Sequence, residues 1–417
     1  MGSQTNQFSS LPVIQHCSEI VNCDTAKLGN CNTSQGFNPA SPSVLHLDLN
    51  SCFASVEAQA NPLLRGHPLA VSVSTRPHGC ILASSYEAKL YGVKTGMSVE
   101  EGRRLCPFLV LREPDPDKYR QVHREIGQLL SEYAPHPLSK SIDEYCFVLP
   151  VGASHGSPAE IAKEIKSRIK SEIGDHLRVS VGISTNQNLA KLASGLHKPD
   201  GLDVIDKNNY QEVFSKITLQ DFCGINVRNE ARLHRVGIFT ALQFSQASIS
   251  TLTQAFQSVL GRYWYSRLRG YEVDDVEFAR RSFGQSYVLP RPMEVSEWRP
   301  ILAKLLAKAA RRLRRAGYLS SGLYVSFRFS DGSHWRLGRE GQESLESDAD
   351  LLAAALALCR DMPARSVKNS PSLVLVLLAT PGSSAVSAIN CGSAPWHRPS
   401  TFLTTNGVNT PSPMAPC

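Results

Sequence analysis

Three carboxylates beside apolar, strand-like runs form the clearest candidate chemical site in the sequence. Asp143 and Glu144 come directly before the apolar run Tyr145–Leu149, and Asp48 ends the run 44–47. Side chains of a strand alternate between its faces, so adjacent acids reach one point only where the backbone turns. Mg²⁺ prefers such oxygen ligands and is often completed by substrate phosphates. The pattern suits a divalent-metal site, whereas an isolated Asp-Glu pair is more often a solvated strand end.

Five segments around these acids resemble, in order, the motifs of the Y-family translesion DNA polymerases, and this resemblance favours the metal site. They read HLDLNSCFASVE at 46–57 with NP at 61–62 and RGHP at 65–68, SYEAK at 85–89 with GV at 92–93, SIDE at 141–144, VGIS at 181–184, and AKLAS at 190–194 running to KPDG at 198–201. The resemblance covers about residues 44–380. Within the family the DNA polymerase IV branch is the most similar, and a polymerase V-type catalytic subunit is the alternative.

The resemblance implies an α+β multidomain fold with the right-hand polymerase architecture of palm, fingers and thumb, plus a C-terminal α/β little finger. The expected parts are a palm over 44–206 with fingers inserted at about 66–112, a helical thumb over 207–272, a linker at 273–282 and a little finger over 283–380. Periodicity predicts strands at 44–47, 69–73 and 178–183 and helices from about Ser51, over 117–133 and over 158–173. Residues 1–43 and 381–417 are polar and aperiodic, so we expect them to be disordered.

Two glycine-containing turns in the expected thumb resemble a helix-hairpin-helix motif. Gly224 and Gly237 lie in these turns, and Asn226 stands where the motif usually has a second glycine. Asparagine tolerates left-handed backbone better than most residues, so the hairpin is expected to form. It would offer backbone N–H groups to a DNA phosphate without reading the base sequence. A plain helix-turn-helix core is the alternative.

The expected little finger combines an amphipathic helix with an alternating strand. The helix has an apolar face at Trp298, Ile301, Leu302, Leu305, Leu306, Ala309 and Leu313, and basic residues off it at Lys304, Lys308, Arg311, Arg312 and Arg315. The strand alternates Leu323, Val325, Phe327 and Phe329 with Tyr324, Ser326 and Arg328. This alternation predicts one buried face. By resemblance the sheet lies along DNA with Ser326 and Arg328 at phosphates, while the basic helix residues are either contacts or a solvated face.

For the acids, the resemblance implies two Mg²⁺ ions and a polymerase reaction on primer-template DNA. Asp48 and Asp143 would bridge both ions. Glu144 would hold the ion at the primer 3′-hydroxyl, and the backbone carbonyl of Leu49 would complete the ion at the triphosphate. Two such ions activate the hydroxyl, orient the deoxynucleoside triphosphate and stabilise the leaving pyrophosphate.

Four further residues are assigned to the nucleotide by the same resemblance. Tyr86, Lys89 and Lys198 would bind the triphosphate, with Lys89 standing where arginine is commoner and so replacing a bidentate fork by a point charge. Phe53 would lie beneath the sugar as a steric gate that excludes a 2′-hydroxyl. Asn50 replaces an acid common at its position, but that acid is not a metal ligand in the family pattern, so activity is expected to survive.

Composition agrees with a polyanionic partner. The chain has 417 residues and a net charge of +7, and residues 281–345 hold 12 Lys and Arg against 5 Asp and Glu. The 11 cysteines lack the paired spacing of a zinc site, so free thiols in a reducing cytoplasm are expected. No apolar run reaches about 18 residues, so we expect a cytoplasmic protein with no membrane partner. We also expect it to be a monomer. The segment 381–417 contains no Gln, so the Gln-led peptide that would recruit a sliding clamp is not visible there.

Two other functions fit parts of the pattern. A catalytically inactive family member that only binds DNA or partners would not need the three acids. A nucleotide cyclase would share the two-metal chemistry, but the thumb-like hairpin and the basic C-terminal module favour an enzyme that copies a template.

Overall fold

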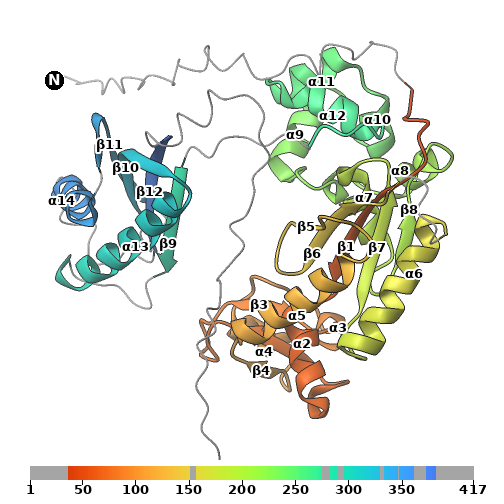
Figure 1. Ribbon diagram of the computed structural model, residues 1–417, viewed down its shortest axis with the longest axis horizontal. Helices are drawn as coiled ribbons and strands as arrows, with labels where there is room; N and C mark the ends of the chain where they lie inside the picture. The colour runs from red at the N-terminus through yellow and green to blue at the C-terminus, as the bar shows by residue number, and fades with distance from the viewer. Residues whose placement is uncertain are drawn as a thin grey trace, which may run out of the picture. The chain divides into compact units, whose positions relative to one another are not determined.

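The computed structural model describes residues 36–150, 156–274, 282–288, 295–328, 333–345, 347–360 and 372–381. The chain divides into two compact units, residues 1–276 and 277–417, and the division falls inside the stretch expected to be a linker. Both units combine helices with sheets, which confirms the α+β class (Figure 1). Most of the two expected disordered tails, at 1–35 and 382–417, lies outside the described residues.

A five-stranded sheet with the order β5-β6-β1-β7-β8 forms the centre of the first unit. Its strands are β1 Val44–Leu49, β5 Leu138–Ser139, β6 Glu144–Val148, β7 Val179–Ser184 and β8 Leu202–Val204. β1 is antiparallel to both β6 and β7, and its register places Asp48 opposite Glu144. Acids far apart in the sequence therefore meet through direct strand pairing. Asp48 lies within β1, not just after it as the sequence suggested.

One face of this sheet holds the main core of the unit. Leu45, Leu47 and Leu49 of β1 pack there against three helices and a π-helical turn (Figure 1): α2 Cys52–Ala60, α5 Pro116–Leu130, α6 Pro158–Arg168 and Ile169–Ile173. The opposite face of β1, which carries His46 and Asp48, is covered by α7 Gln187–Leu196. Burial on both faces explains why β1 reads as an almost continuous apolar run.

The approach of α7 to the sheet depends on Gly182 of β7. A Cβ atom at this position would overlap the carbonyl oxygen of Ala190 and the backbone nitrogen of Ser194. Both are backbone atoms of α7, so the helix as a whole would have to move.

Gly182→Ala is expected to lower the free energy of unfolding by about 1–3 kcal/mol or more, because overpacked cores cost that much. Gly195→Ala, in α7, is the matched control because nothing lies within 4 Å of its added Cβ. That variant is expected to gain up to about 1 kcal/mol from helix propensity. Urea unfolding measures both, and equal midpoints for the two variants would contradict the packing argument.

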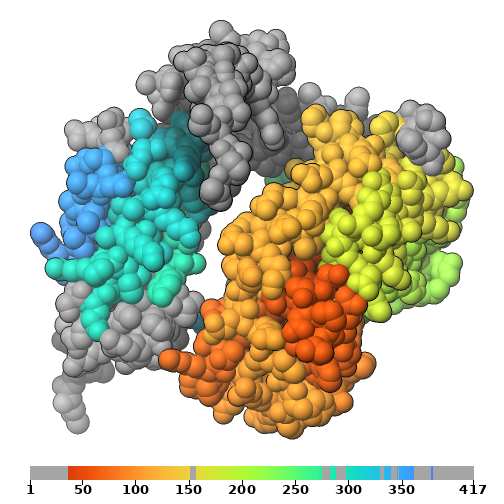
Figure 2. All heavy atoms as spheres, turned by 60° about the horizontal axis from the view of Figure 1, so that its bottom comes forward, coloured from red at the N-terminus to blue at the C-terminus, as the bar shows by residue number. Residues whose placement is uncertain are grey.

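A second, three-stranded sheet lies within the segment 66–112 and has the order β3-β2-β4. Its strands and the nearby helices are β2 Leu69–Ser72, β3 Ile81–Ser84, β4 Val110–Arg112, the 3₁₀ turn Pro62–Leu64, α3 Tyr86–Leu90 and α4 Val99–Leu105. α2 touches β2 and β3 on one side and α5 on another. The red and orange surface of this region is accordingly continuous with the yellow and green surface around the large sheet (Figure 2).

The remainder of the first unit is helical, as its pattern predicted for 207–272. Its helices are α8 Tyr210–Lys216, the 3₁₀ turn Leu219–Asp221, α9 Val227–Arg235, α10 Ala241–Gln246, α11 Ile249–Phe256 and α12 Leu260–Leu268. Phe37 stacks on Tyr210 with ring centroids 4.3 Å apart, and the Asn38 side chain donates to the carbonyl of Gly270. The expected disordered leader 1–43 was therefore too long, because an aromatic residue near its end finds a partner 173 positions further along the chain.

The turn before α9 forms for a different reason than expected. Gly224 has a positive φ of 103°, as a tight turn requires. Asn226, however, has φ −95° and caps α9 by accepting a hydrogen bond from the backbone N–H of Asn229. Asn226 therefore acts as the N-cap of α9. The expectation that it adopts left-handed backbone is wrong. Gly237, with φ 83°, follows the end of α9.

The second unit is a four-stranded antiparallel sheet with the order β11-β10-β12-β9 and two helices. Its elements are β9 Ser282–Val288, α13 Val295–Arg315, β10 Tyr318–Arg328, β11 His334–Leu345, α14 Asp348–Cys359 and β12 Ser372–Pro381. The predicted apolar face of α13 packs on Leu323, Val325 and Phe327 of β10, which are fully buried. Phe329 lies outside the described residues.

The basic residues of α13 are exposed, and two arginines of the helix have partners inside the unit. Arg312 donates to the carbonyl of Gly284, and Arg314 pairs with Asp348 at 2.7 Å. Because α13 covers the face of Leu323 and Phe327, Ser326 and Arg328 project from the opposite face of the sheet. Within the described residues, no helix is long and apolar enough to cross a membrane.

Candidate active site

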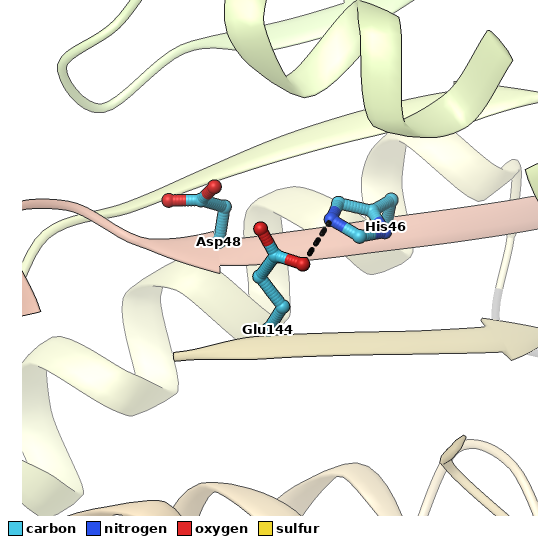
Figure 3. A group of neighbouring side chains, drawn as sticks. All are labelled: His46, Asp48 and Glu144. Carbon is cyan, nitrogen blue, oxygen red and sulfur yellow. Dashed lines mark ion pairs between the residues drawn. The ribbon is translucent and has the colours of Figure 1, made fainter. Parts of the chain in front are cut away.

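His46 and Asp48 of β1 and Glu144 of β6 point toward one another on one face of the large sheet (Figure 3). Each offers a ligand atom within 4.8 Å of the other two. The Nε2 atom of His46 lies 3.8 Å from the Oε2 atom of Glu144, which is too long for a hydrogen bond. Two carboxylates at this spacing suit a divalent cation.

Asp48 borders two cavities. Glu144 lines one of them and Asp143 lines the other. A cavity of about 420 Å³ is lined by residues that include Asp48, Glu144, Lys191 and Lys198. A cavity of about 220 Å³ is lined by residues that include Asp48, Leu49, Phe53, Lys89, Asp143 and Lys198. Asp143 is not in the group within 4.8 Å, and it borders the smaller cavity together with Asp48. Asp48 is shared, and its two neighbours flank it.

The strand end explains this separation. Glu144 is the first residue of β6, whereas Asp143 precedes the strand and its carbonyl accepts from the backbone N–H of Leu49 at 2.8 Å. The Asp143 carboxylate accepts from the Ser141 hydroxyl at 2.6 Å. Consecutive residues at a strand end point to different sides, and here each side has its own cavity.

Two lysines neutralise the acids. The Lys191 ammonium lies 2.8 and 2.7 Å from the two carboxylate oxygens of Glu144, and the Lys198 ammonium lies 2.5 Å from Asp48. Burial, together with the charge of Lys191, lowers the pKa of His46 to about 4, so its imidazole is neutral at pH 7. Burial and the nearby Asp143 and Asp48 charges raise the pKa of the Cys52 thiol to about 12, which excludes a thiolate nucleophile at pH 7.

Asn50 connects β1 to the loop that carries Lys198. Its side-chain oxygen accepts from the Asp200 backbone N–H at 2.7 Å and from the Ser180 hydroxyl at 3.1 Å. The Ser180 hydroxyl in turn accepts from the N–H of Gly201 at 3.2 Å. Asn50 is only 1% exposed, so these groups have little access to water as a substitute partner.

Asn50→Ala is expected to cost about 1–3 kcal/mol of stability, because it leaves buried donors without an acceptor. If Lys198 binds the triphosphate as the resemblance implies, the variant should also raise the KM for nucleotide, because the loop of Lys198 loses its hydrogen bond to Asn50 at the end of β1. Asn50→Asp keeps an oxygen acceptor, so it is expected to lose less stability and to raise the KM less than Asn50→Ala does. Thermal unfolding and steady-state kinetics test this, and an unchanged KM for Asn50→Ala would show that the loop is held by other contacts.

Tyr86 begins α3 and Lys89 lies in its last turn, and the two side chains are neighbours. The Lys89 ammonium donates to the Ser51 hydroxyl at 2.7 Å and lies 4.5 Å from the centre of the Tyr86 ring. Burial, and next the charge of Lys198, lowers the pKa of Lys89, while burial raises the pKa of Tyr86. Lys89 and Lys198 border the same cavity, so two cations face one space suited to an anion.

Phe53 is half-buried and borders the cavity of Asp48 and Asp143. Its ring stacks on Tyr119 of α5 with centroids 4.4 Å apart and an interplanar angle of 16°. The Tyr119 hydroxyl donates to the buried Glu57 carboxylate at 2.9 Å, and Lys118 pairs with the other oxygen of that carboxylate. The stacking on Tyr119, which Glu57 holds in place, therefore fixes the position of the Phe53 ring. No feature of the sequence had indicated Tyr119.

Sequence reasoning also missed His46 and Lys191. Both residues lie inside the motifs quoted above, so the motifs could have indicated them. Their proximity to Glu144, however, follows from the register of β1 on β6 and from the packing of α7 on the sheet. The predicted DNA contacts lie elsewhere: Gly224 and Gly237 at the turns before and after α9, and Ser326 and Arg328 on the open face of β10 in the second unit.

Comparison with known proteins agrees with this arrangement. Residues 47–195 match the impB/mucB/samB family, and residues 279–376 match the C-terminal domain of that family. DNA polymerase IV of Moorella thermoacetica is 36% identical over 324 residues, covering 75% of this chain and 80% of that protein. DNA polymerase IV of Bacteroides fragilis is 30% identical over 324 residues, covering 76% of this chain and 88% of that protein.

Solved structures show the same fold. The Y-family DNA polymerase chimera Dbh-Dpo4(243-245)-Dbh has a TM-score of 0.69 and 24% identity, covering 81% of this chain and 98% of that one. The insertion ternary complex of Dbh DNA polymerase has a TM-score of 0.54 and 23% identity, covering 82% and 99%. The chain thus has the fold of a Y-family polymerase. It belongs to the impB/mucB/samB family, and its curated relatives named above are DNA polymerases IV.

Proposed function

We propose that the protein is a template-directed DNA polymerase of the translesion type. It adds deoxynucleotides to a primer 3′-hydroxyl by two-metal phosphoryl transfer, with low fidelity and without proofreading, in DNA damage tolerance. The observation that carries the proposal is that the pairing of β1 with β6 brings Asp48 and Glu144 together, while Asp143 borders a cavity with Asp48. Carboxylates gathered around Asp48 suit a pair of cations about 3.5–4 Å apart.

The cofactor of this proposal is a pair of Mg²⁺ ions. The donor set of carboxylates and a backbone carbonyl fits a hard cation. When bound, the ions supply Lewis-acid chemistry that activates the hydroxyl and stabilises the leaving pyrophosphate. Asp48 and Asp143 would hold both ions and Glu144 the ion at the hydroxyl. The backbone carbonyl of Leu49 would be a ligand of the ion at the triphosphate.

The nucleotide would occupy the cavity that Lys89, Lys198 and Phe53 border. Lys89 and Lys198 bind the triphosphate through their charges, and Tyr86 adds a hydroxyl donor. Lys198 would exchange its pairing with Asp48 for the phosphate when the nucleotide enters. Phe53, supported by Tyr119, lies beneath the sugar and excludes a 2′-hydroxyl.

In this proposal the two units take the parts of a right hand. Residues 44–206 form the palm with fingers at about 66–112, residues 207–272 the thumb and residues 283–380 the little finger. Gly224 and Gly237 would offer backbone contacts to primer-template DNA, and Ser326 and Arg328 contacts to phosphates. The enzyme would act as a cytoplasmic monomer, and a sliding clamp is a partner without a motif visible in 381–417.

Extension of a primed template by the purified protein with Mg²⁺ tests the function. Template-dependent addition is expected on undamaged DNA and on lesion-bearing DNA. A nucleotide cyclase would consume nucleotide without template, and an inactive accessory protein would bind the DNA without extending it. Either result would refute the proposal.

A further inference from the structure

Lys191 holds the Glu144 carboxylate by both oxygens. The distances from its ammonium are 2.8 and 2.7 Å, and the Glu144 side chain is only 18% exposed. His46, at 3.8 Å, is the other basic group beside this carboxylate in the described structure, and that distance is too long for a hydrogen bond. Lys191 is therefore the cation that pairs with Glu144 here.

We propose that Lys191 is an internal counter-ion, a positioning residue that must give up at least one oxygen of Glu144 before a divalent cation binds there. This inference rests on the proposed function, because it takes Glu144 as a metal ligand. Lys191 contacts both oxygens of the carboxylate and therefore competes with a cation for them. A metal ion and an ammonium group close together on one carboxylate also repel each other.

The cavity beside Glu144 has room for the Lys191 side chain after it leaves the carboxylate. Lys191 lies on α7, its side chain is 36% exposed, and the cavity of about 420 Å³ beside it is also lined by Asp221. Asp221 belongs to the helical part of the unit, and its Oδ2 atom already accepts from Thr218, so its other oxygen is the second acceptor that borders this cavity. Lys198 is bound to Asp48 in a similar way, but a nucleotide phosphate would draw it off. No nucleotide phosphate is proposed to bind Lys191. Its release from Glu144 therefore depends on the binding of the cation.

Two effects of opposite sign distinguish a counter-ion from a merely structural lysine. Without Lys191, the metal-free protein retains an unbalanced, partly buried carboxylate and is less stable. The same carboxylate then binds a divalent cation more tightly, because no ammonium competes for it. A structural lysine would lower stability and leave metal affinity unchanged or weaker.

Direct Mn²⁺ binding to the full-length protein, without DNA or nucleotide, tests the proposal. Free Mn²⁺ is followed by electron paramagnetic resonance for the wild type, Lys191→Met, Lys191→Gln, Lys191→Arg, Glu144→Gln and Lys163→Met. Both uncharged variants of Lys191 are expected to bind roughly three- to tenfold more tightly and to melt at a lower temperature without metal. Lys191→Arg, which keeps the charge, should stay within about twofold of the wild type. Lys163, exposed on α6, controls for the general loss of positive charge.

The outcomes separate this inference from the proposed function. If Glu144→Gln loses Mn²⁺ binding but neither uncharged Lys191 variant binds more tightly, the counter-ion role is overturned and the metal site stands. If Lys163→Met tightens binding as much as Lys191→Met, the effect is one of net charge and the inference is wrong. If wild type and Glu144→Gln bind Mn²⁺ equally, Glu144 is not a ligand, so the counter-ion role is overturned and the proposed metal site loses this residue, while primer extension still tests the proposed function separately.

Discussion

Glu144→Gln and Asp143→Asn are each expected to lower the rate of nucleotide addition by about 10³-fold or more. A ligand that stabilises charge in the transition state contributes several kcal/mol, and each 1.4 kcal/mol is about tenfold in rate. A carboxamide keeps the shape of the side chain but lacks the negative charge that holds a cation. Single-turnover primer extension measures the chemical step directly.

DNA binding provides the internal control for these variants. Affinity for primer-template DNA comes mainly from basic groups at phosphates, so both variants should bind it within a few-fold of the wild type. Glu164→Gln, which removes an exposed carboxylate on α6 that accepts from Tyr133, should extend primers normally. Near-normal extension by Glu144→Gln or Asp143→Asn would remove that residue from the site.

Phe53→Ala is expected to raise ribonucleotide incorporation relative to deoxynucleotide incorporation by roughly 10²-fold or more. Sugar discrimination is a difference between two transition-state affinities, and shortening the ring opens space for the 2′-hydroxyl. Deoxynucleotide use should fall less than ribonucleotide use rises. The ratio of kcat/KM for a matched ribo- and deoxynucleotide pair measures this.

Packing alone would give a different result. If Phe53 were only a core residue, its removal would cost about 3–5 kcal/mol of stability and depress both substrates together. The melting temperature therefore accompanies the kinetics. Phe108→Ala, at an exposed ring that meets Tyr91 edge-on, is the matched control and should leave the sugar ratio unchanged. An unchanged ratio for Phe53→Ala would exclude the steric gate.

Local signals in the sequence located most of the candidate site. Asp48 was found from its place beside an apolar run, Leu49, Phe53, Lys89 and Lys198 were assigned by resemblance to the family motifs, and the structure brings all five to one cavity together with Asp143. The alternating strand and the amphipathic helix of the second unit were likewise predicted, because burial on one face leaves a period of 2 or 3.6 residues.

What the sequence could not show depends on contacts between distant residues. The pairing of Lys191 with Glu144 needs the position of α7 on the sheet, and the packing of Phe37 on Tyr210 needs the helical region to be assembled. The pairing of Asp48 with Glu144 likewise needs the register of β1 on β6, which no local pattern gives. Asn226 was misread because a turn residue and a helix N-cap share the same amino-acid preference.

The order of strands in the large sheet has a consequence for synthesis of the protein on the ribosome. β1 is made first, yet its partners β6 and β7 end at Val148 and Ser184. At about 5–20 residues per second, β1 waits roughly 5–20 s for β6 and several seconds more for β7. During that time an apolar strand has both edges unpaired, which is a template for aggregation. Chaperone capacity and growth temperature should therefore govern the yield of active protein more than the stability of the finished fold.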